Sequence, residues 1–189
     1  MGCGGTGGAR GQVELPKNLT IFGHIMDSQT RSLMGICDKA GVKYIFNKID
    51  TIAGDNKQAR YLSINPTGHI PMIEEGHFKV LGGNHIILIF LCKSKSHIGD
   101  KLMPSSDEQK IKGILGWYHA KMFTPGNQIF RMFYETKAFP VPPGVNTYNK
   151  WKEDFLQCFR ALDDKLINQP YLCSEKMSVG DIVVFNEIS

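Results

Sequence analysis

The stretch NPTGHIPMI, residues 65–73, has a proline inside an apolar run that otherwise resembles the start of a β-strand. Pro71 has no N–H for a neighbouring strand, and proline is normally excluded from central strands. Pro66 and Gly68, just before it, are typical of a turn. Either this run is not a strand, or Pro71 lies where the backbone must stay open for another partner.

Strand and helix patterns alternate before this stretch. Residues 19–25 (LTIFGHI) and 42–49 (VKYIFNKI) resemble short buried strands, and between them apolar residues recur at helical spacing over 33–40. A helix that joins two strands within so few residues forms a βαβ unit, with parallel strands and the helix on one face.

The segments after the stretch predict a hairpin and then only helices. Residues 70–75 and 77–81 form two strand-like runs around a Glu-Gly pair, and an apolar helix that Asn84 can cap follows. With the mixed, polar segment over residues 56–62 between the second strand and the hairpin, the first half reads β-α-β-α-β-β-α. In the second half strand patterns stop, and Ser178 with Asp181 predicts a capping box before a last apolar helix.

Composition predicts a globular protein with free thiols and no metal site. Of the 189 residues, 42% are hydrophobic and 21% charged, and the net charge of +4 is spread along the chain, which argues against nucleic-acid binding. The five cysteines and six histidines show no metal-ligand spacing, and the odd cysteine count fits a reducing compartment. No signal peptide or membrane-spanning run is present in the sequence, so we expect a cytoplasmic protein.

Two motifs resemble those of one enzyme family. Residues 65–71 resemble the Asn-Pro-x-Gly-x-Val/Ile-Pro segment of cytosolic glutathione transferases, and residues 178–188 (SVGDIVVFNEI) resemble the Ser/Thr-x-x-Asp box in a buried helix of their C-terminal domain. With LTIFGHIMDSQTR, residues 19–31, the resemblance extends from residue 19 to 189, and its spacing is most similar to the theta-like classes.

This resemblance implies a fold of two domains. An α/β thioredoxin-like, glutathione-binding domain is expected over residues 18–97, after a Gly-rich tail at 1–17, and an all-α domain over residues 104–189. Because family members continue through further helices, we expect the C-terminal domain to be incomplete and the chain to be marginally stable.

The resemblance also implies a detoxifying enzyme. A homodimeric glutathione transferase would use glutathione as cosubstrate, without a metal, and join its thiol to small apolar electrophiles. The alternative is a non-catalytic binding or scaffolding protein, such as the glutathione-transferase-like domain of a translation elongation factor subunit. Six residues could line the apolar pocket or belong to the core: Met122, Phe123, Phe130, Met132, Phe133 and Tyr134.

The family pattern also suggests glutathione contacts. It implies a cis bond before Pro71, with the N–H and C=O of Ile70 pairing with the ligand backbone like an added strand. Gly83 and Asn84 match the pair that holds the γ-glutamyl group, although Gly83 lacks the acidic side chain and Asn84 could be only a helix cap. The glycyl carboxylate would meet His69, Asn56 and Lys57.

Asp27 and Ser28 are the two candidates for the residue that activates the thiol. In theta-like members, a serine four residues before the helix arginine donates its hydroxyl to the sulfur, and counting back from Arg31 gives Asp27. A carboxylate there would raise the pKa of the thiol. A shift of one residue would bring Ser28 or the helix N-terminus to the sulfur, although Ser28 could instead be only the N-cap.

The N-terminal sequence MGCGGT has two interpretations. Gly2 with Thr6 matches the myristoylation pattern, and Cys3 is a candidate for palmitoylation. Two acyl chains would anchor the protein stably to a membrane surface. The alternative is a flexible, unmodified tail.

We predict weak conjugation activity that falls in Ser28→Ala and rises, or shifts to lower pH, in Asp27→Ser. The reason is that a hydroxyl stabilises a thiolate and a carboxylate repels it. Initial rates with glutathione and an aryl halide, measured across pH, check this. If Ser28→Ala keeps its rate while Asp27→Ala loses it, Asp27 acts as a base or a protonated donor instead.

Overall fold

The computed structural model describes residues 19–81, 84–134 and 143–189. The N-terminal half of the chain contains β1 (Leu19–Gly23), α1 (Ser28–Ala40), β2 (Tyr44–Lys48), the 3₁₀ turn η1 (Asp55–Lys57), α2 (Ala59–Leu62), β3 (Met72–Glu75), β4 (Phe78–Val80) and α3 (Asn84–Ser94). The C-terminal half contains α4 (Ser96–Leu102), α5 (Glu108–Trp117), the π-helical segment η2 (Tyr118–Phe123), α6 (Thr124–Tyr134), α7 (Val145–Leu166) and α8 (Val179–Ile188).

The four strands form one mixed sheet in the order β2-β1-β3-β4. β1 pairs with β2 in parallel and with β3 antiparallel, and β3 pairs with β4 antiparallel. These pairings confirm the predicted βαβ unit and hairpin. The thioredoxin-like α/β half and the helical half that follows it are therefore as predicted.

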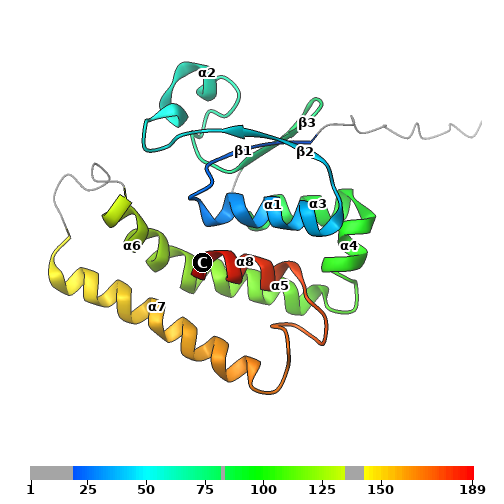
Figure 1. The fold of residues 1–189 in the computed structure, drawn as a ribbon, viewed down its shortest axis with the longest axis vertical. Coiled ribbons are helices and arrows are strands. Elements are labelled where there is room, and N and C mark those ends of the chain that lie inside the picture. The colour runs from blue at the N-terminus through cyan, green and yellow to red at the C-terminus, as the bar shows by residue number, and fades with distance from the viewer. Residues whose placement is uncertain (1–18, 82–83, 135–142) are drawn as a thin grey trace, which may run out of the picture.

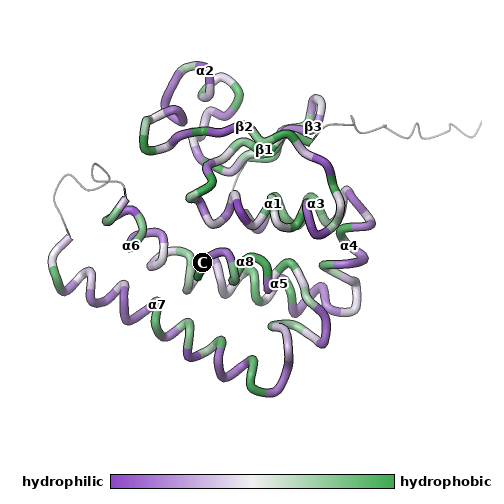
Figure 2. Tube along the Cα trace, in the orientation of Figure 1, coloured by the Kyte–Doolittle hydropathy of each residue, from purple (hydrophilic) through white to green (hydrophobic). Residues whose placement is uncertain are grey.

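The molecule is layered around α1 (Figure 1). α2 lies on one side of the sheet and α1 with α3 on the other, while α8 and α5 lie beyond α1 and α7 forms the outer edge. Hydrophobic residues gather along the central α8, whereas hydrophilic residues recur along α7 (Figure 2). The last helix of the described chain is therefore an inner element of the fold.

The alternation of side chains along the strands divides the core between the two faces of the sheet. Ile21 and Ile73 are cross-strand partners, are buried, and belong to the large cluster that includes α1, α3, α5 and α8. Their neighbours Phe22 and Met72 face the other way and form a smaller cluster with Tyr61 of α2. A period of two along β1 and β3 thus gives each face its own apolar layer.

α4 was not predicted, because its pattern is too short. Only Ile98 and Leu102 are buried in this seven-residue helix, which is too few apolar positions to show a helical period. It lies where the sequence suggested a link between residues 97 and 104. Nor did the sequence predict that α5 continues through the π-helical η2 into α6.

The described cysteines are buried free thiols, as predicted. Cys37, Cys92, Cys158 and Cys173 form no disulfide. Burial raises the pKa of the Cys37 and Cys92 thiols to about 12, so neither is a ready nucleophile. Within the described ranges, no helix combines the length and the apolar character needed to cross a membrane.

The predicted capping box at the start of α8 is confirmed. Asp181 accepts hydrogen bonds from the backbone N–H and the hydroxyl of Ser178 at 2.8 and 2.7 Å through Oδ2. Its other oxygen accepts the N–H of Leu172 at 2.7 Å. One carboxylate therefore fixes both the first turn of α8 and the loop that leads into it.

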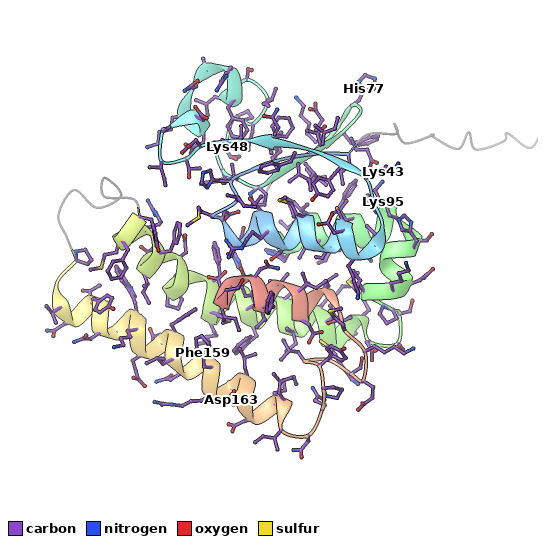
Figure 3. The ribbon with its side chains drawn as sticks, in the orientation of Figure 1. Lys43, Lys48, His77, Lys95, Phe159 and Asp163 are labelled. Carbon is purple, nitrogen blue, oxygen red and sulfur yellow. The ribbon has the colours of Figure 1, made fainter. Side chains whose placement is uncertain are left out.

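We predict that Asp181→Ala lowers the free energy of unfolding by about 2 kcal/mol or more, since it removes a helix cap and leaves the Leu172 N–H without its partner. Urea unfolding monitored by circular dichroism measures this. Asp163→Ala is the matched control, because Asp163 is exposed on α7 (Figure 3) and should change stability by less than about 0.5 kcal/mol. Equal effects in the two variants would contradict the prediction.

Candidate active site

A cleft of about 940 Å³ opens where the N-terminus of α1 meets the helical half. One wall is mostly polar and comes from the β1–α1 loop, residues 51–57 and residues 68–70. The opposite wall comes from η2, α6, α7 and the end of α8, and its apolar residues are Phe123, Ile129, Phe130, Phe133, Tyr134, Phe155 and Ile188. The cleft therefore offers unlike surfaces to the two ends of a ligand.

The buried side chain of Asn65 holds the turn of the opening stretch in place. Its Nδ2 donates to the carbonyl of His69 at 2.7 Å, and its Oδ1 accepts the hydroxyl and the N–H of Thr67 at 2.6 and 3.2 Å. The hydroxyl of Tyr61 donates to the same His69 carbonyl at 2.8 Å. This network fixes the backbone immediately before Ile70.

Gly68 permits the tight turn between Asn65 and the strand. Its φ of 65° lies in the left-handed region that favours glycine. Its carbonyl accepts Nδ2 of Asn56 at 2.9 Å, while Oδ1 of Asn56 is buried without a hydrogen-bond partner among the described protein atoms. Asn56 thus ties the 51–57 segment to the turn and is itself part of the cleft lining.

Pro71 lies just outside the strand that the opening stretch predicts. The Ile70–Pro71 bond is cis, as the resemblance implied. Sheet pairing starts one residue later, where Met72 lies opposite Phe22. Ile70 therefore precedes the ladder and lines the cleft.

Asp27 is the N-cap of α1, and Ser28 is the first residue of the helix. Oδ2 of Asp27 accepts the N–H and the hydroxyl of Thr30 at 2.7 and 2.6 Å. Burial raises the pKa of Asp27, against the lowering effect of these two hydrogen bonds. The alternative in which Ser28 is the N-cap is wrong, because the neighbouring carboxylate makes those bonds.

Ser28 points toward the helical half. Its hydroxyl donates to Oε2 of Glu187 on α8 at 2.6 Å, and the hydroxyl of Tyr118 donates to the same oxygen at 2.8 Å. Burial raises the pKa of Glu187 to about 7, although both hydroxyls favour its charged form. Sequence patterns did not indicate Glu187 or Tyr118 as site residues, and they lie 159 and 90 residues from Ser28 in the chain.

Arg31 fastens the loop beside the cleft to α8. Its guanidinium donates to the carbonyls of Ile25 and Met26 at 3.1 and 3.0 Å and to that of Asn186 at 2.6 Å. These bonds hold the β1–α1 loop and the end of α8 at a fixed distance. Ser28 and Glu187, which lie next to these anchors, are thereby brought together.

Gly126 makes room for the Glu187 carboxyl group. A Cβ at position 126 would lie 2.6 Å from Oε1 of Glu187 and 2.9 Å from Cε2 of Phe155. Real Cβ atoms do not approach other atoms so closely. A glycine is therefore needed here for α6 to pass beside the carboxyl group without displacing it.

The apolar cluster noted in the sequence divides between cleft and core. Four of its members line the cleft: Phe123, Phe130, Phe133 and Tyr134. Met122 is fully buried in the main cluster. The ring of Phe123 also stacks on His119, with centroids 5.7 Å apart.

Some of the remaining predicted residues line the cleft, and others lie outside the residues that the structure describes. His69 and Lys57 are exposed and line the cleft. α3 begins at Asn84, whose side chain is not described, and Gly83 lies outside the described residues, as do Gly2 and Cys3. No group of three or more His, Cys, Asp or Glu side chains among the described residues could hold a metal ion.

Comparison with known proteins finds similar sequences in one family. Residues 17–88 match the model described as Glutathione S-transferase, N-terminal domain. The chain is 23% identical to glutathione S-transferase theta-2 of Homo sapiens over 176 residues, which cover 90% of this chain and 70% of the human protein. It is 29% identical to glutathione S-transferase F10 of Arabidopsis thaliana over 171 residues, covering 87% of this chain and 76% of the plant protein.

A solved structure shares the fold. The crystal structure of human glutathione transferase theta-2, in complex with glutathione and an unknown ligand, superposes with a TM-score of 0.79 at 20% sequence identity. The match covers 90% of this chain and 70% of that chain. Both the α/β half and the helical half are therefore those of a glutathione transferase fold.

We predict that Glu187→Gln removes a pH dependence of stability. Because the folded pKa of about 7 exceeds the usual 4.5, the fold retains a proton that the unfolded chain releases, and stability falls as pH rises from about 4.5 to 7. Relative to the variant, the wild type should lose on the order of 2 kcal/mol of unfolding free energy between pH 5 and pH 8.

Urea unfolding at the two pH values measures this difference. Glu175→Gln is the control, because Glu175 is exposed before α8 and should leave the wild-type pH dependence intact. Parallel stability curves for the wild type and Glu187→Gln would contradict the prediction.

Proposed function

We propose that this chain, which has the sequence signature and the fold of the glutathione S-transferases, binds glutathione in the cleft and joins its thiol to apolar electrophiles. The observation that carries the proposal is the pairing of unlike walls, with backbone and polar groups on one side and aromatic rings on the other. A polar peptide thiol and an apolar partner need such a pair of surfaces side by side.

Glutathione lies along the polar wall in this proposal. The backbone of Ile70, which precedes the sheet ladder, pairs with the cysteinyl part of the ligand as an added strand would. Lys57 and His69, both exposed on the wall, receive the glycyl carboxylate beside Asn56. The N-terminus of α3, from Asn84, receives the γ-glutamyl carboxylate after Gly83.

Ser28, and not Asp27, activates the thiol in this proposal. Asp27 and Ser28 both line the cleft, but Asp27 already accepts two hydrogen bonds as the cap of α1. A hydroxyl and the N-terminal N–H groups of α1 both stabilise a thiolate. The thiolate then attacks the electrophile, so that a carbon–sulfur bond forms as the leaving group departs or the acceptor bond opens.

The apolar wall receives the electrophile. Phe123, Phe130 and Phe155 contribute aromatic faces from η2, α6 and α7, opposite the start of α1. Such surfaces bind flat apolar compounds through contact area and ring stacking. The reacting carbon would then lie within reach of the sulfur while the rest of the molecule stays out of water.

The proposal also includes the location, the oligomeric state and the N-terminal modification of the enzyme. A cytoplasmic, detoxifying homodimer is supported by the resemblance to its family. Acylation of Gly2 and Cys3, with attachment to a membrane surface, is supported by the N-terminal pattern alone, and an unmodified tail is its alternative.

We predict that Lys57→Ala and His69→Ala each weaken glutathione binding about two- to fivefold without changing the melting temperature, since both side chains are exposed and act only on the ligand. Isothermal titration calorimetry with glutathione measures this. Lys152→Ala, an exposed lysine on α7 outside the cleft, is the control and should bind like the wild type.

Two outcomes would separate the proposal from its alternatives. A wild-type protein that does not bind glutathione contradicts the proposed function. A protein that binds glutathione but conjugates none of a panel of aryl halides, epoxides and unsaturated carbonyls is the non-catalytic binding protein instead.

A further inference from the structure

A half-buried carboxyl group of α8 lies in the lining of the cleft. Glu187 lines the cleft from α8, and its Oε2 is within hydrogen-bond distance of two hydroxyl groups, Ser28 at 2.6 Å and Tyr118 at 2.8 Å. The three groups come from α8, the first turn of α1 and the π-helical η2. Serine and carboxylate thus form a hydroxyl–acceptor pair that faces the ligand space.

Among the residues that the structure describes, no charged group forms a salt bridge with Glu187. Asp27, one residue before Ser28, raises the pKa of Glu187, and the Arg31 guanidinium lowers it by a smaller amount than burial raises it. Arg31 directs its hydrogen bonds to three backbone carbonyls, those of Ile25, Met26 and Asn186. The Glu187 carboxyl group can therefore exchange a proton near neutral pH.

We propose that Glu187 accepts the thiol proton of glutathione through Ser28. This inference rests on the proposed function and adds a residue and a pH dependence to it.

The thiol proton reaches Glu187 through a concerted shift of two protons. The S–H bond of glutathione breaks and its proton moves to Oγ of Ser28, while the Ser28 O–H proton moves to Oε2 of Glu187, and the electron pair stays on sulfur. After the thiolate has attacked, Glu187 returns the proton to the leaving group or to water. Tyr118 holds Oε2 at the end of this path.

The geometry distinguishes this role from that of a plain helix cap. A cap needs only an acceptor for backbone N–H groups, and Asp27 already supplies it for α1. Ser28 instead donates away from its own helix, to a side chain that can change its charge. A purely structural bond between α1 and α8 would survive replacement of Glu187 by a neutral amide, whereas proton acceptance would not.

The test compares the wild type with Glu187→Gln, which keeps an oxygen that can accept both hydroxyls. The pH profile of kcat/KM for conjugation of an aryl halide is measured from pH 5.5 to 9.5, together with glutathione binding by isothermal titration calorimetry. In the wild type kcat/KM should rise through a pKa near 7, as Glu187 loses its proton and can accept that of the thiol. In Glu187→Gln kcat/KM should instead follow the thiol itself, with a pKa of about 8.5, and the rate at pH 7 should fall about tenfold or more.

Two further variants complete the design. Glu153→Gln, on the exposed face of α7, is the matched control and should reproduce the wild-type profile. Tyr118→Phe removes one donor to Oε2 and should move the profile to higher pH while the fold is kept. If Glu187→Gln fails to fold, the Tyr118→Phe profile decides between support and contradiction.

The possible outcomes are distinct. An unshifted kcat/KM profile in a folded Glu187→Gln that binds glutathione overturns the role of Glu187 and leaves the proposed function standing. If Glu187→Gln does not fold, an unshifted kcat/KM profile in Tyr118→Phe overturns the role of Glu187. Absence of glutathione binding in the wild type overturns both the inference and the proposed function.

Discussion

The packing of α1 on both of its sides is the constraint on which the rest of the structure depends. Leu33, Ile36 and Cys37 are completely buried within the cluster that also contains Ile21 of the sheet and Val183 of α8. A single helix thus belongs to the cores of both halves, which share one continuous apolar interior (Figure 1). The cleft lies at the N-terminus of this helix, so its shape is set by the fit of α1 to the sheet and to α8.

The fold was largely predictable because its signals are local. A proline before a strand, a glycine in a turn and apolar residues at helical spacing all act within a few residues, and β3, α1 and α8 follow from them. α4 escaped prediction because it buries only two apolar residues, Ile98 and Leu102. The π-helical turn after Trp117 depends on how α5 and α6 pack, which no short pattern encodes.

The candidate site was predictable on one wall only. The segment up to Ile70 and the Asp27–Ser28 pair belong to the motifs that the sequence displays, although the sequence alone left open which of the two caps α1. Hydrogen bonds to Thr30 decide this in favour of Asp27. Glu187 and Tyr118 approach Ser28 only through tertiary packing, and nothing in their own surroundings in the sequence marks them.

Gly126 gives this arrangement an evolutionary consequence. Because a methyl group at position 126 would occupy the space of the Glu187 carboxylate and press on the Phe155 ring, the residue tolerated at one position depends on the residue present at the other. A side chain at position 126 requires both the Glu187 carboxyl group and the Phe155 ring to move, so a smaller residue at position 187 relieves only one of the two contacts. Among related sequences, a larger residue at position 126 should therefore accompany changes at positions 155 and 187, although the three positions lie on different helices.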